Sequence, residues 1–201
     1  MSFTVHSRFF EPPAVSQKEI LRYAGCKGAE RKLLGLVEEC MREVENKLSY
    51  RVCYCRLPVS IQESQVDFGA FSCCSSSLAK NLSGCNEAVL FAATVGIELD
   101  RMIERYSRLS PAKAVIFDAI GAERIESLCD VFCHSFAEEE NALAIPRFSP
   151  GYGDLPLADQ KNIFAVLGCE KRIGLVLNDS LLMSPSKSVT AIVGLKEKNK
   201  E

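Results

Sequence analysis

The stretch Pro146-Arg147-Phe148-Ser149-Pro150-Gly151-Tyr152 is the most informative part of this chain. Two prolines bracket and stiffen the residues between them, and Pro150-Gly151 is a turn signal that lets the backbone approach a ligand closely. Arg147 offers a planar guanidinium suited to a carboxylate, and Tyr152 offers an aromatic face suited to an adenine ring or a sulfonium cation. On these residues alone, a plain surface turn remains the commoner explanation.

The segments on either side of this loop follow a definite order. Ser110 and Pro111 form a cap and a first helical residue, and they predict a helix to about residue 139 that contains Ala114–Ala122 and Glu126. After the loop we expect a helix over 157–167, then a short helix or turn over 172–177. The last recognisable motif is Met183-Ser184-Pro185-Ser186-Lys187-Ser188-Val189.

In order and spacing, these segments resemble the activation domain of cobalamin-dependent methionine synthase, where an Arg-x-x-x-Gly-Tyr loop holds S-adenosylmethionine. Gln17–Gly25 and Ala92–Leu99 are also similar to segments of stand-alone members of that family. The likeness covers most of residues 16–195 and is strongest over 112–194.

The resemblance implies a role for each residue of the loop. Arg147 would bind the methionine carboxylate of S-adenosylmethionine, while Tyr152 and the Pro150-Gly151 backbone would hold the adenosyl part. Glu126 on the preceding helix would face the ligand amine or sulfonium, and Glu123 is the alternative for that role. The resemblance assigns neither a catalytic residue nor a metal ligand to this chain.

The resemblance also implies a reactivation subunit that acts in trans on a cobalamin-dependent methionine synthase lacking its own activation domain. Such a subunit would dock on the cobalamin module and present S-adenosylmethionine for reductive remethylation of cob(II)alamin, with an electron from flavodoxin. The alternative is a docking partner of another corrinoid methyltransferase protein, without competent use of S-adenosylmethionine. Charged residues 196–201 favour this alternative, because the family has a ligand-contacting Tyr there.

Strands interleaved with helices, several of them short, predict an α+β fold. We expect one domain with a twisted, mainly antiparallel sheet flanked by helices. An N-terminal arm is expected over 1–15, the domain over 16–195 and a charged tail over 196–201. Helices are expected over 16–25, 28–48, 76–82 and 98–106, and strands over 50–61, 87–95, 180–183 and 188–195.

Composition excludes several classes of protein. The 201 residues are 47% hydrophobic and 25% charged, which is ordinary for a globular chain. A net charge of -2 without a basic stripe argues against nucleic acid as a partner. No apolar run of membrane-spanning length and no signal pattern at the N-terminus are found, so we expect a cytoplasmic protein that does not associate with membranes.

Ten cysteines are a high count for a chain of this length. None form a Cys-x-x-Cys pair, and the chain has only two histidines, so we interpret the cysteines as buried free thiols. His134 is interpreted as a surface residue near the end of a helix. Asp118 is expected either to pair within the core or to face the binding cleft.

Overall fold

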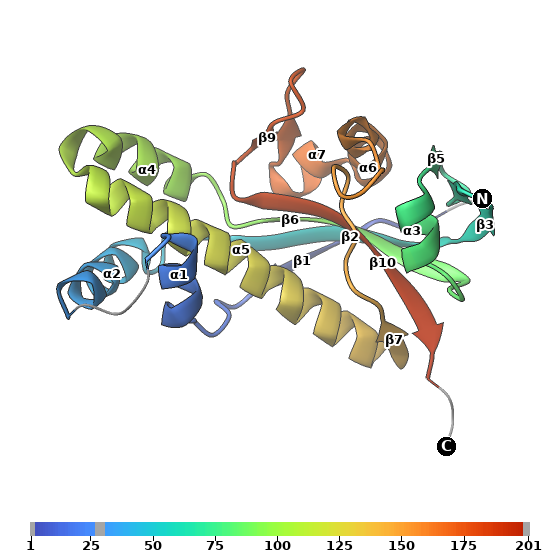
Figure 1. The fold of residues 1–201 in the computed structure, drawn as a ribbon, viewed down its shortest axis with the longest axis horizontal. Coiled ribbons are helices and arrows are strands. Elements are labelled where there is room, and N and C mark those ends of the chain that lie inside the picture. Colours follow the sequence, from blue (N-terminus) through green and yellow to red (C-terminus); the bar gives the residue numbers. More distant parts are fainter. Residues whose placement is uncertain (1–2, 27–30, 199–201) are drawn as a thin grey trace.

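Five antiparallel strands form the central sheet, and helices cover both of its faces (Figure 1). The computed structural model describes residues 3–26 and 31–198. The strand order is β1-β2-β6-β10-β7, and every neighbouring pair is antiparallel. The strands are β1 (His6–Phe10), β2 (Tyr50–Pro58), β6 (Glu87–Thr94), β10 (Ser188–Glu197) and β7 (Ala142–Ala144).

The middle strands β2 and β6 are apolar on both sides because both faces of the sheet are covered. Successive side chains on a strand point to opposite faces. The cross-strand pair Tyr54 and Phe91 therefore faces one core, and the next pair, Cys55 and Leu90, faces the other. All four residues are buried. This cover on both faces explains the continuous apolar run that predicts a buried strand over 87–95.

Helix α5 (Pro111–Glu139) lies along the first face of the sheet, and its bounds agree with the prediction from sequence (Figure 1). It buries Phe117, Ile120, Leu128 and Phe132 in the first core. Three further helices pack against α5. These are α1 (Gln17–Tyr23), α2 (Arg31–Val44) and α4 (Glu98–Leu109).

Shorter elements cover the second face. The helical ones are α3 (Ser76–Asn81), η1 (Leu157–Asp159), α6 (Gln160–Leu167) and α7 (Cys169–Ile173). Two small antiparallel sheets lie beside them: β3 (Ser60–Gln62), β4 (Gln65–Asp67) and β5 (Ser72–Cys74) form one, and β8 (Val176–Leu177) and β9 (Met183–Ser184) form the other. The architecture is the predicted α+β fold with an antiparallel sheet.

The N-terminal segment differs from the arm that the sequence suggests, because His6–Phe10 forms the edge strand β1 on β2. Ser16 caps α1, with its hydroxyl accepting from the Glu19 N–H at 3.4 Å. The Glu19 carboxylate does not return to the Ser16 N–H but pairs with Arg22 at 2.7 Å. The Ser16 N–H instead donates to Glu123 at 2.9 Å, which ties the segment to α5.

The C-terminal elements also depart from the expected bounds. The helix expected within 172–177 is α7, which begins directly after Gly168, a residue with φ of +60°. The strand expected over 180–183 is reduced to Met183–Ser184 in β9. Strand β10 continues to Glu197 because its end pairs with β7, and residues 199–201 of the expected charged tail lie outside the described residues.

Candidate functional site

The loop between β7 and η1, residues 145–156, runs along the outer edge of β10 and is called the Arg147 loop after its arginine. The Phe148 N–H donates to the Ile192 carbonyl at 2.9 Å, and the Ile192 N–H donates back to the Phe148 carbonyl at 2.8 Å. The Ile145 N–H donates to the Gly194 carbonyl at 3.0 Å. These backbone bonds fix the position of Arg147 relative to the sheet.

The turn predicted at Pro150-Gly151 is present. Gly151 has φ of +92°, a backbone conformation that favours glycine. Its N–H donates to the Leu155 carbonyl at 2.9 Å, and the Tyr152 N–H donates to the Ser149 carbonyl at 3.1 Å. The turn therefore closes on itself and presents Tyr152, whose ring is 68% exposed.

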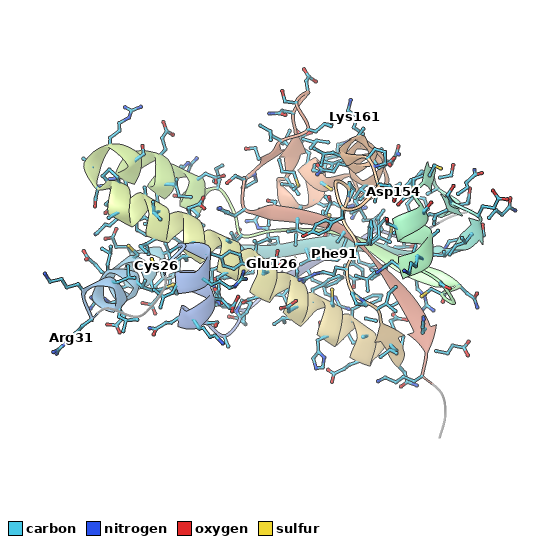
Figure 2. The ribbon with its side chains drawn as sticks, in the orientation of Figure 1. Cys26, Arg31, Phe91, Glu126, Asp154 and Lys161 are labelled. Carbon is cyan, nitrogen blue, oxygen red and sulfur yellow. The ribbon has the colours of Figure 1, made fainter. Side chains whose placement is uncertain are left out.

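Asp154 anchors the end of this loop to the start of α3 (Figure 2). Its carboxylate accepts a hydrogen bond from the Ser75 hydroxyl and from the N–H groups of Ser76 at 2.8 Å and Ser77 at 3.0 Å. These hydrogen bonds, the one from Ser75 above all, hold the pKa of Asp154 well below its ordinary value. Gly153 is needed beside them, because a Cβ atom there would lie 2.7 Å from Ser77 Oγ.

Arg147 lies against two carboxylates of α5. Its Nη2 donates to Glu126 Oε2 at 2.8 Å, and its Nη1 is 2.9 Å from Asp130 Oδ1, without the geometry of a hydrogen bond. Glu126 and Asp130 are four residues apart, so one face of α5 presents both of them to the loop. Figure 2 shows Glu126 near the middle of that helix. The Arg147 side chain is 23% exposed, so it is held in place but still reaches solvent.

A cleft of about 1010 Å³ opens between α5, β7, the Arg147 loop and the start of β10. Acidic side chains line the α5 wall: Glu126, Asp130 and Glu138. The remaining wall is mixed and includes the polar side chains of Gln160, Ser188 and Thr190 with the apolar Leu143, Ile145, Met183 and Val189.

Most of the residues predicted for the site meet in this cleft. Glu126, Arg147, Pro150 and Tyr152 all line it, and Gly151 shapes the turn that carries Pro150 and Tyr152. The structure therefore brings the predicted residues together, while their contact with a ligand stays a prediction.

Glu123, the alternative to Glu126, lies elsewhere. Its side chain is 2% exposed and pairs with Arg124 at 2.5 Å. Arg124 in turn donates to the carbonyls of Pro13 and Ala14, so this pair holds the N-terminal segment on α5. Of the two glutamates, only Glu126 faces Arg147.

Asp130, Gln160 and Thr190 are polar cleft residues that were not predicted from the sequence. Asp130 had a readable signal, because it follows Glu126 by one helical turn. Gln160 and Thr190 are 6% and 2% exposed, and no local pattern marks either as a cleft residue. Gln160 Oε1 and Thr190 Oγ1 are buried atoms that have no hydrogen-bond partner among the described residues.

The other sequence candidates have structural roles. His134 is a surface residue that lines the cleft 3.3 Å from Glu138. The Asp118 carboxylate pairs with Lys187 at 2.7 Å, but its side chain is 60% exposed and does not line the cleft, so neither position expected for it is correct. All ten cysteines fall within the described residues and are free; seven are buried as expected, while Cys26 and Cys133 are half-buried and Cys74 is exposed. Burial raises the pKa of Cys133, which lines the cleft, to about 11, so this side chain is a neutral thiol at neutral pH.

Within residues 3–26 and 31–198, no group of three or more His, Cys, Asp or Glu side chains is arranged to hold a metal ion. No helix in that part of the chain is long and apolar enough to cross a bilayer.

Comparison with known proteins finds similarity in structure alone. No protein-family model matches the sequence. No curated protein matches it either. Among solved structures, the crystal structure of the MetH reactivation domain bound to AdoHcy aligns with a TM-score of 0.70 and 15% identity, covering 98% of this chain and 80% of that one.

The fold is that of the MetH reactivation domain. The resemblance drawn from the Arg147 loop is thereby confirmed at the level of fold. The alignment covers nearly the whole chain, including the N-terminal strand β1 that the sequence analysis placed outside the domain.

Proposed function

We propose that the cleft beside Arg147 binds S-adenosylmethionine, and that the protein reactivates a cobalamin-dependent methionine synthase in trans. The observation that carries this proposal is the position of Arg147. It lies in a cleft, between two carboxylates, within the fold of a reactivation domain that was solved with AdoHcy.

The cleft fits such a ligand in size and in polarity. Small-molecule pockets occupy about 300–1,000 Å³, and the cleft reaches the upper end of this range. S-adenosylmethionine carries one carboxylate and two positive groups, the ammonium and the sulfonium. Arg147 complements the carboxylate, while Glu126 and Asp130 complement the positive groups.

Arg147 is already oriented before a ligand arrives. Glu126 accepts from Nη2, while Nη1 is 2.9 Å from Asp130 Oδ1 without the geometry of a hydrogen bond. A ligand carboxylate that accepts from Nη1 would take the place of Asp130 there, without breaking the bond to Glu126. In this arrangement Tyr152 and the Pro150-Gly151 backbone hold the adenosyl part, and Glu126 also faces the amine or sulfonium.

The protein contributes binding and orientation in this proposal, and the corrinoid of the partner carries the chemistry. A methyl group from S-adenosylmethionine and one electron from a reducing partner such as flavodoxin restore the methylated corrinoid and leave S-adenosylhomocysteine. The partner is the cobalamin module of a methionine synthase, and the proposed location is the cytoplasm. Residues 16–195, extended by β1, form the functional domain.

A docking partner of another corrinoid protein is the second candidate. The low aromatic content of the cleft favours this candidate. Tyr152 is the one Phe or Tyr side chain among the described lining residues. The two candidates differ in whether this chain binds S-adenosylmethionine well enough to present it.

Calorimetric titration of S-adenosylmethionine into the purified protein tests the proposal. Arg147→Ala should weaken binding tenfold or more, because losing a charged hydrogen bond costs about 1.5–3 kcal/mol. Arg101→Ala is the matched control, since Arg101 is an exposed arginine on α4 that pairs with Glu98 away from the cleft. Failure of the unaltered protein to bind at millimolar ligand would overturn the proposal. Binding without reactivation of an oxidised cobalamin module would favour the second candidate.

A further inference from the structure

Two buried polar side chains in the cleft have oxygens that the protein leaves unbonded. Gln160 is 6% exposed and Thr190 is 2% exposed. Neither Gln160 Oε1 nor Thr190 Oγ1 has a hydrogen-bond partner within the described part of the chain, although both residues line the cleft. Buried polar side-chain atoms in folded proteins are hydrogen-bonded in the large majority of cases. Each residue therefore has hydrogen-bonding capacity at the cleft wall that the described part of the protein does not use.

The two residues reach the cleft from the second face of the sheet. Gln160 is the first residue of α6, which covers that face. Thr190 is two residues before Ile192 on β10, so its side chain points to the same face as Ile192, which belongs to the second core. Glu126 and Asp130, which hold Arg147, come from α5 on the first face.

The cleft wall therefore combines two kinds of lining. Arg147, Glu126 and Asp130 are charged and suit the amino-acid part of a ligand. Gln160 and Thr190 are neutral and buried, and an uncharged heterocycle matches them better than a carboxylate or an ammonium group does. A ligand that joins an amino acid to a neutral polar ring would use both kinds.

A carboxamide recognises adenine by a paired contact, because its oxygen accepts from the 6-amino group while its nitrogen donates to a ring nitrogen. We infer that Gln160 and Thr190 form an adenine-recognition subsite of the cleft, in which Gln160 is the specificity-determining residue. This inference rests on the proposed binding of S-adenosylmethionine and adds to it the residue that selects the base. Thr190 contributes a hydroxyl that can donate or accept beside the same ring.

Ligand analogues test the inference without altering the protein. The counterpart of S-adenosylhomocysteine with hydrogen in place of the 6-amino group has no donor for Gln160 Oε1, whichever way the amide is turned. The unaltered protein should bind S-adenosylhomocysteine at least tenfold more tightly than this 6-deamino analogue. Equal affinity for the two, with binding still dependent on Arg147, would overturn the inference and leave the proposed function standing.

Matched variants then assign the preference to the residues. Gln160→Leu and Thr190→Val keep approximate volume and remove the polar atoms, and thermal melts report whether each variant is folded. We expect Gln160→Leu to reduce the preference for the adenosyl ligand over its 6-deamino analogue to less than threefold and Thr190→Val to weaken adenosyl binding severalfold. A preference that survives Gln160→Leu would overturn the assignment to Gln160.

A 2′-deoxyadenosyl analogue separates recognition of the base from recognition of the sugar. If the buried oxygens bond the ribose, this analogue will lose affinity on the unaltered protein but not on Gln160→Leu, and the adenine assignment fails. Absence of binding by every one of these ligands to the unaltered protein would overturn the subsite together with the proposed function.

Discussion

Arg147 Nη2 donates a 2.8 Å hydrogen bond to Glu126 Oε2, which joins the cleft loop to the middle of α5. The Arg147 side chain is 23% exposed and the Glu126 side chain is 45% exposed, so the pair lies at the wall of the cleft and not in the core. Ion pairs with this exposure contribute about 0–1 kcal/mol to folding. The main effect of the pair is therefore to orient the guanidinium.

Glu126→Gln should weaken ligand binding and leave the stability of the protein nearly unchanged. We expect the free energy of unfolding in urea to change by less than about 1 kcal/mol. Affinity for S-adenosylmethionine should fall tenfold or more, because the variant loses a charge that faces the ligand cation. Glu138→Gln is the control, since Glu138 lines the same cleft but its side chain pairs, within the described part of the chain, only with the exposed His134. Equal losses of affinity in both variants would contradict the role given to Glu126.

Local signals explain why much of the fold was predictable. Ser110 and Pro111 mark the start of α5, and the apolar run over 87–95 marks a strand covered on both faces. Strand β1 was missed because an edge strand depends on its partner, here β2, and five residues contain no decisive alternation. The pairing of an edge strand is a long-range property.

The site was predictable where residues are close in sequence or spaced along one helix. Arg147 and Tyr152 share one turn, and Glu126 lies on the predicted helix. Gln160 and Thr190 line the same cleft because the Arg147 loop pairs with the edge of β10. Their burial depends on that tertiary contact, so no pattern in either segment reveals it.

Gly121→Ala should destabilise the protein. A Cβ atom at Gly121 would lie 2.3 Å from Leu99 Cδ2 and 2.7 Å from Lys187 Cγ. Leu99 is fully buried and Lys187 is held by Asp118 at 2.7 Å, so neither neighbour moves away freely. Overpacking of this kind costs about 1–3 kcal/mol, measurable by urea unfolding.

Gly35→Ala is the matched control for this substitution. Gly35 is also helical, but a Cβ atom there would meet no atom within 4 Å. We expect it to stabilise the protein by about 0.5–1 kcal/mol, since alanine favours a helix. Similar effects from the two substitutions would refute the steric explanation at Gly121.

Arg124→Met should be the most destabilising of these changes. It leaves Glu123 as a buried carboxylate without its cation, and removing one partner of a buried pair costs about 3–5 kcal/mol. Combining it with Glu123→Leu should recover much of this loss, because no unpaired charge remains. Urea unfolding of both proteins measures the difference. A double variant as unstable as the single one would show that the backbone bonds to Pro13 and Ala14 dominate instead.

Asp154→Asn should make the thermal stability of the protein less dependent on pH in the acidic range. The folded protein holds the pKa of Asp154 below its ordinary value through hydrogen bonds from Ser75 and the start of α3. The stabilisation is therefore present above the pKa of Asp154 in the unfolded chain, about 4, and is lost as the pH falls through its lower pKa in the folded protein. The Tm of the unaltered protein should exceed that of Asp154→Asn at pH 7, and the gap should narrow below about pH 4.

Other carboxylates titrate equally in both proteins, so the gap isolates Asp154. Asp179→Asn changes an exposed carboxylate of the β8–β9 turn and should give no gap at either pH. A gap that stays constant from pH 7 to pH 3 would mean that shape, and not the carboxylate charge, anchors the loop.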